Sequence, residues 1–198
     1  MALSIANITI ELREILLKDR PNSLYEISPK GTVPVLQTAD KVIEESMDII
    51  NWAIDQSSNE NSLLENIDTQ KEWIHKNDTD FKKWLDRYKY NERFEDLTLE
   101  ECKTKAKEII DLYEESLNHH SYLINNKLQK VDICIFPFIR QFANVNMDYF
   151  SSTFPNTKKW LDKLLDSDLF KSVMKKYPQW QLDDQQLIIN FKNELIEA

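Results

Sequence analysis

Residues 28–36 read SPKGTVPVL, and they contain the only glycine in a chain of 198 residues. A sequence this poor in glycine retains one where the backbone needs a positive φ angle or a close approach. Val33 and Pro34 follow, and a proline cannot donate to a strand ladder, so this step predicts a turn or a strand entrance. Eleven residues beyond Pro34, Glu45-Ser46 opens a segment with helical apolar spacing. The stretch therefore predicts a strand entrance followed by a helix start.

The rest of the chain divides into a mixed part and a helical part. We expect strands at 8–17, 33–37 and 41–44, a short helix or turn at 22–27, a hairpin turn at 38–40, and a helix from Ser46, as its N-cap, to about Gln56. From about Asp68 the apolar spacing predicts helices near 68–90, 97–118, 131–146, 156–165 and 167–176, with a polar helix around 183–196. The predicted fold class is α/β plus all-α: a βαββα domain at 1–57, a linker at 58–67 and a helical domain at 68–198.

The composition excludes several partners. The net charge is −9, and binding to nucleic acid or to an anionic membrane surface needs clustered Lys and Arg, so we expect neither. No apolar run reaches the length of a membrane span, and the first residues lack the basic segment of a secretory signal.

The cysteines and histidines indicate no metal centre. Cys102 and Cys134 form no C-x-x-C pair, which predicts neither a disulfide framework nor a zinc site, and a reducing cytoplasm is the expected location. His75, His119 and His120 form no ligand set, so no bound metal is expected.

Five segments together resemble a bacterial branch of the cytosolic glutathione S-transferase family. They are SPKGTVPVL at 28–36, EESMDI at 44–49, LDRYKY at 85–90, DICIFPFIRQF at 132–142 and MKKYPQW at 174–180. The resemblance implies a thioredoxin-like domain that binds glutathione as co-substrate, followed by a helical domain that supplies a pocket for a small electrophile. It also implies a homodimer and a role in detoxification.

The resemblance further implies a glutathione site. Its residues are Val33, Pro34, Glu45 and Ser46, with Thr32, Arg20 and Lys30 beside them. In thioredoxin-like folds the X-Pro bond is cis, and a peptide-like ligand pairs with the Val33 backbone like an added strand. A helix N-terminus favours a carboxylate, to which Ser46 adds a hydroxyl donor, while Glu45 can pair with an α-ammonium. From the residues alone, a serine N-cap preceded by a solvated glutamate is the alternative, and Arg20 and Lys30 are solvated surface charges.

Two further segments match the helical domain. Lys82, Trp84, Arg87 and Tyr88 are predicted to line the second-substrate cleft, and a structural helix with a solvated basic face is the alternative. Asp132 matches the S/T-x-x-D capping motif of the family's core helix, but the expected Ser or Thr is Gln129. A glutamine is a poor N-cap, so we expect a helix start weakened by about 1 kcal/mol.

The family's catalytic turn has no counterpart in this sequence. Residues 1–6 resemble the end of the family's first helix, so we expect the first strand, the catalytic turn and most of that helix to lie upstream of Met1. The predicted function is conjugation of glutathione to an electrophile, or its exchange with a disulfide, by a thiol-activating residue upstream of Met1. The alternative is a non-catalytic interaction protein on the same fold, of the stringent-starvation type.

Overall fold

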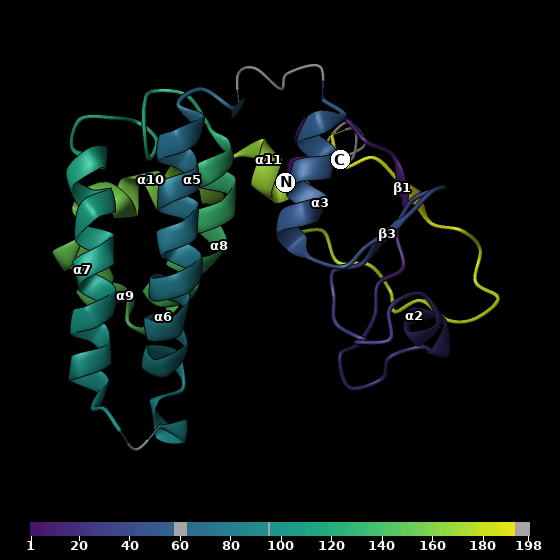
Figure 1. Ribbon diagram of the computed structural model, residues 1–198, viewed down its shortest axis with the longest axis horizontal. Helices are drawn as coiled ribbons and strands as arrows, with labels where there is room; N and C mark the ends of the chain where they lie inside the picture. Colours follow the sequence, from purple (N-terminus) through teal and green to yellow (C-terminus); the bar gives the residue numbers. More distant parts are fainter. Residues whose placement is uncertain (58–62, 95, 193–198) are drawn as a thin grey trace. The chain divides into compact units, whose positions relative to one another are not determined.

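The computed structural model describes residues 1–57, 63–94 and 96–192, and the chain forms two compact units (Figure 1). The first unit comprises Met1–Glu60 together with Asp168–Ala198, and the second comprises Asn61–Ser167. The predicted domain at 68–198 therefore differs from the structure, because residues 168–192 belong to the N-terminal unit. Part of the predicted linker, at 58–62, lies outside the described residues.

The first unit has the predicted βαββα order, preceded by one short helix. Its elements are α1 (Ala2–Ile5), β1 (Ile10–Glu11), α2 (Asn22–Ile27), β2 (Leu36–Gln37), β3 (Val42–Ile43), α3 (Ser46–Asp55), α11 (Asp168–Val173) and β4 (Ile188–Ile189). β2 and β3 form an antiparallel hairpin in which Leu36 faces Ile43, as the spacing of the two strands predicts. The strands are shorter than predicted, with two residues each.

The C-terminal segment adds a strand to this unit. β4 pairs antiparallel with β1, so that Ile10 faces Ile189, and the Trp180 amide donates to the Glu14 carbonyl at 2.8 Å. The polar helix predicted around 183–196 is therefore wrong over its described residues, and residues 193–196 lie outside them. Two adjacent β-branched isoleucines favour a strand once an unpaired strand edge is near.

The second unit is helical. Its elements are α5 (Ile67–Lys76), the π-helical turn η1 (Asn77–Phe81), α6 (Lys82–Lys89), the 3₁₀ turn η2 (Asn91–Arg93), α7 (Leu99–Leu117), α8 (Lys130–Val145), α9 (Met147–Thr153) and α10 (Pro155–Leu165). α5, η1 and α6 together span the helix predicted at 68–90, and they run beside α7 in Figure 1. The sequence prediction missed α9.

The centre of the helical unit is a cluster of aromatic rings around Phe142 on α8. The Tyr88 ring lies 4.9 Å from that of Phe142, and the rings of Phe81, Phe150 and Phe154 lie 6.0 to 6.3 Å away. All five side chains are buried. Aromatic pairs at these separations add to the stabilisation that comes from burial alone, so this cluster fixes α6 against α8 and α9.

A buried polar network fixes the start of α8. The Asp132 carboxylate accepts hydrogen bonds from the backbone amides of Gln129 and Leu123 and from the Trp160 indole, at 2.8 to 2.9 Å. The Gln129 side chain is fully buried and accepts a hydrogen bond from Gln70 on α5 at 3.0 Å. Gln129 therefore has a partner 59 residues away, which the local capping preference does not take into account.

Candidate functional site

The loop before β2 turns at Gly31. Its φ angle is +62°, and its amide donates to the Ser28 carbonyl at 2.9 Å. A Cβ atom at this position would overlap the ring of Tyr25. The sequence predicted a positive φ or a close approach at this glycine, and the structure shows both. Only glycine meets both demands without strain.

Three charged side chains join this loop to the start of α3. The Lys30 ammonium lies 3.5 Å from the Glu45 carboxylate and 3.8 Å from that of Glu44. The Ser28 hydroxyl donates to Glu44 at 2.6 Å. The structure thus brings together the loop and the helix start, which the sequence assigned to one site. Arg20 is exposed and takes part in none of these contacts.

Val33 lies in an exposed stretch of this loop. The Val33-Pro34 bond is cis, as expected for this fold, and Thr32, Val33 and Pro34 are all exposed. The Val33 amide and carbonyl make no hydrogen bond with the residues that the structure describes. An extended ligand can therefore use both groups, as an added strand would.

The helix start differs from the prediction in one respect. Glu45, not Ser46, is the N-cap of α3, because Glu45 has the extended backbone (φ −106°, ψ 134°) while Ser46 is already helical. No side chain caps the first turn of α3, and the Ser46 hydroxyl has no partner among the described residues. The predicted capping role of Ser46 is wrong. Its hydroxyl and amide remain available to an external acceptor.

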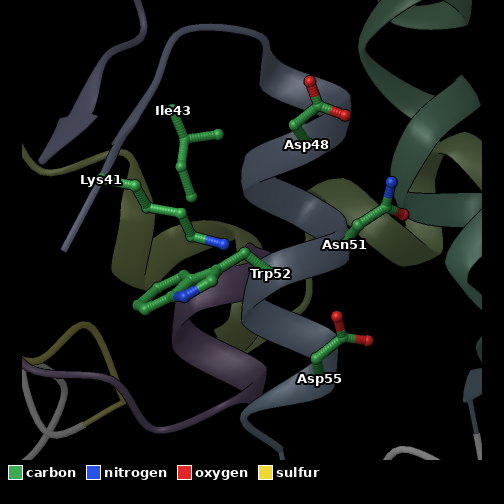
Figure 2. Close-up of a pocket in the computed structure, with 6 residues that line it drawn as sticks. All are labelled: Lys41, Ile43, Asp48, Asn51, Trp52 and Asp55. Atoms are coloured by element: carbon green, nitrogen blue, oxygen red, sulfur yellow. The ribbon is translucent and has the colours of Figure 1, made fainter. Parts of the chain in front are cut away.

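A cavity that the sequence prediction missed lies along α3 (Figure 2). It has a volume of about 360 Å³ and is lined by Lys41, Ile43, Asp48, Asn51, Trp52 and Asp55. Asp48, Asn51 and Asp55 follow the i, i+3, i+7 spacing of one helix face, and that spacing was visible in the sequence. None of the predicted glutathione residues lines this cavity, and its acidic side chains do not suit an anion.

The predicted second-substrate residues do not form one set. Tyr88 is 4 % exposed and packs in the aromatic core, where burial raises the pKa of its phenol. Arg87 donates to Asp96 at 2.5 Å and lies over the Phe94 ring. Trp84 is half-buried beneath the Lys83 ammonium. Lys82 lines a cavity between α6 and α8 on this unit.

Neither cysteine is placed for thiol chemistry. Cys102 and Cys134 are both buried. Burial raises the pKa of the Cys134 thiol to about 12, so this thiol stays protonated at neutral pH.

Comparisons with known proteins agree with this architecture. Residues 1–62 match the family described as "Glutathione S-transferase, N-terminal domain", and residues 80–168 match "Glutathione S-transferase, C-terminal domain". The second match ends at residue 168, where the second unit ends and the C-terminal part of the first unit begins. No curated protein matches the sequence as a relative.

Several solved structures share the fold at low sequence identity. A mutant of poplar glutathione transferase F1 superposes with a TM-score of 0.72 at 17 % identity, over 87 % of this chain and 88 % of that one. The ternary complex of BphK, a bacterial GST, gives 0.70 at 20 % identity, over 87 % and 90 %. A glutathione S-transferase-I bound with lactoylglutathione gives 0.67 at 21 % identity, over 87 % and 90 %.

The architecture is a thioredoxin-like N-terminal domain followed by a helical C-terminal domain. The chain belongs to the glutathione S-transferase family. None of the helices in the described ranges is long and apolar enough to cross a membrane.

Proposed function

We propose that the chain binds glutathione on its N-terminal unit and acts as a glutathione transferase. The γ-glutamyl end lies on Glu45 and Ser46, and the cysteinyl backbone pairs with Val33 beside Thr32 and Pro34. Lys30 and Arg20 are the cations assigned to the glycyl carboxylate. The thiol then adds to an electrophile or exchanges with a disulfide in a second-substrate pocket of the helical domain.

The observation that carries this proposal is the start of α3. Ser46 has a hydroxyl without a partner among the described residues, and it lies at a helix N-terminus, where the amides and the dipole favour a carboxylate. The contact between Lys30 and Glu45 holds the Gly31–Pro34 loop to this helix start. A peptide-like ligand with a free α-amino acid end fits both features. Thiol activation is assigned to none of these residues.

The Lys30 contact also favours a second candidate, a non-catalytic interaction protein on the same fold. The carboxylate of Glu45 that would hold the ligand ammonium already has a cationic partner at 3.5 Å. Glutathione must displace or share that partner, because Glu45 is the only acidic residue assigned to the γ-glutamyl end. An interaction protein would keep the Lys30–Glu45 pair.

Calorimetric titration of the folded full chain with glutathione and with cysteinylglycine separates the two candidates. Cysteinylglycine lacks the γ-glutamyl end, so the transferase proposal expects glutathione to bind at least about tenfold more tightly. Equal affinity, or no binding by a chain whose helical circular dichroism is intact, would favour the interaction protein.

We further propose that the chain is a cytoplasmic homodimer, as in the family that it belongs to. Light scattering coupled to size exclusion should give twice the 23.6 kDa of one chain. A mass of 23.6 kDa at micromolar concentration would contradict the dimer.

A further inference from the structure

The Lys30 ammonium lies near two carboxylates that are adjacent in the sequence, where β3 ends and α3 begins. It is 3.5 Å from the Glu45 carboxylate and 3.8 Å from that of Glu44. One cation faces two anions, so this group of three side chains carries one uncompensated negative charge. One further cation can therefore be accommodated here, and the α-ammonium of a bound ligand is such a cation.

The two carboxylates differ in how firmly they are held. The Glu44 side chain is 29 % exposed and accepts a hydrogen bond at 2.6 Å from the hydroxyl of Ser28, which is fully buried. The Glu45 side chain is 67 % exposed, and Lys30 is its one side-chain partner in the part of the chain that the structure describes. Glu44 is thus a fixed anion, while Glu45 is accessible to a ligand.

The Lys30 ammonium can move from one carboxylate to the other at little cost. Its side chain is 58 % exposed, and exposed ion pairs contribute little to stability. A lysine carries its charge on a flexible four-carbon stem, and the ammonium already lies within 4 Å of both acids. The contact with Glu44 therefore provides a second position for Lys30 when a ligand occupies Glu45.

We propose that Glu44 is a positioning residue that makes the site specific for ligands with a free α-ammonium. When such a ligand binds Glu45, Lys30 pairs with Glu44 instead, so that two cations face two carboxylates. Without the charge of Glu44, Lys30 and the ligand ammonium would compete for one carboxylate and repel each other. This proposal rests on the proposed binding of glutathione at Glu45 and Ser46, and it leaves Arg20 as the cation for the glycyl carboxylate.

The test titrates the full chain calorimetrically with glutathione and with glutaryl-cysteinylglycine, which is glutathione without its α-amino group. Both probes carry the thiol and the two carboxylates, so the ratio of their affinities reports on the ammonium alone. The wild type should bind glutathione about threefold to fivefold more tightly. Glu44→Gln should bring this ratio close to one, although the introduced amide oxygen can still accept the Ser28 hydrogen bond. Lys30→Gln should raise the ratio, because it removes the competing cation.

Two further variants separate the proposed exchange from a general effect of charge. In a chain that already carries Lys30→Gln, the additional change Glu44→Gln should alter the ratio by less than about twofold, because no lysine remains to be repositioned. Glu26→Gln removes the same charge from an exposed residue of α2 that makes no ion pair among the described residues. This control should keep the wild-type ratio.

The proposal is overturned if glutathione binds and Glu44→Gln keeps the wild-type ratio, or if Glu44→Gln lowers the ratio equally with and without Lys30. An equal loss in Glu26→Gln would also overturn it, as would a ratio in Lys30→Gln below that of the wild type. All of these results leave glutathione binding itself in place. A wild-type chain with intact helical circular dichroism that binds neither probe would instead contradict the proposed function, and this inference with it.

Discussion

The two units of this chain differ in how they use their side chains. In the helical unit, aromatic rings and a polar network are buried together around α8, as Phe142 and Asp132 illustrate. In the N-terminal unit, a loop whose Val33 is 42 % exposed precedes strands of two residues, and the Ser46 hydroxyl has no partner in the part of the chain that the structure describes. Buried, satisfied groups stabilise the fold, while exposed, unpaired groups remain available to a ligand. The difference predicts that substitutions in the buried clusters of the helical unit change stability most, while substitutions at the exposed loop and helix start of the N-terminal unit change it little.

The largest expected effect tests the helical unit. Phe142→Ala should lower the free energy of unfolding by about 3–5 kcal/mol, because the cavity left among four rings cannot close fully. Urea unfolding followed by circular dichroism measures the loss. Val145→Ala, at the exposed end of the same helix, is the matched control and should cost less than about 1 kcal/mol. Similar losses in both variants would mean that the ring cluster does not dominate stability.

The polar network should matter nearly as much as the rings. Asp132→Ala leaves three buried donors without their acceptor, and we expect a loss of about 3 kcal/mol at pH 7. Asp148→Ala, an exposed aspartate in the first turn of α9, should change stability by less than about 1 kcal/mol. Chemical denaturation measures the free energy of unfolding of both variants. Equal losses in the two variants would mean that the buried network does not stabilise the helical unit.

The N-terminal unit should respond in the opposite way. Ser46→Ala removes one donor to a charged carboxylate and should weaken glutathione binding by about 1.5–3 kcal/mol. The melting temperature should stay constant, because Ser46 makes no capping bond. Ser121→Ala, on the helical unit, should leave both quantities unchanged. Wild-type affinity in titration calorimetry of Ser46→Ala would remove Ser46 from the binding site.

The contribution of Asp132 should depend on pH. Burial raises the pKa of its carboxyl to about 6, from the 3.8 of an ordinary aspartate. The folded state therefore binds this proton more tightly than the unfolded state, and the stability gained in this way is lost as the pH rises through 6. The difference in unfolding free energy between wild type and Asp132→Ala should widen by about 1 kcal/mol from pH 7 to pH 5. A difference that narrows over this range would contradict the raised pKa.

The smallest expected effect concerns the turn at residue 31. Gly31→Ala places a Cβ at a positive φ against the Tyr25 ring, and we expect a loss of about 1 kcal/mol, since Tyr25 is exposed and its ring can move. Gly31→Asn should cost less, because asparagine tolerates this conformation better than alanine. Thermal melts of the two variants provide the ranking, and an alanine variant at least as stable as wild type would contradict it.

Several features of the site could be predicted because they depend on local chemistry. A lone glycine indicated its own positive φ, and Val33-Pro34 marked a strand entrance. The prediction failed at Ser46, because a backbone turn one residue earlier gave the N-cap position to Glu45. It also failed at Tyr88, since helical spacing alone does not say which face of α6 meets α8.

Packing decided the features that pair residues far apart in the chain. The βαββα order of the first unit, the positions of α7, α8 and α10 and the exclusion of membrane spans came from periodicity and composition, which each segment carries by itself. The pairing of Ile189 with Ile10, the Gln70 partner of Gln129 and the cavity between α6 and α8 came from tertiary structure. Such contacts are absent from the local sequence, because strand edges, buried amides and cavities acquire their partners only when distant segments pack together.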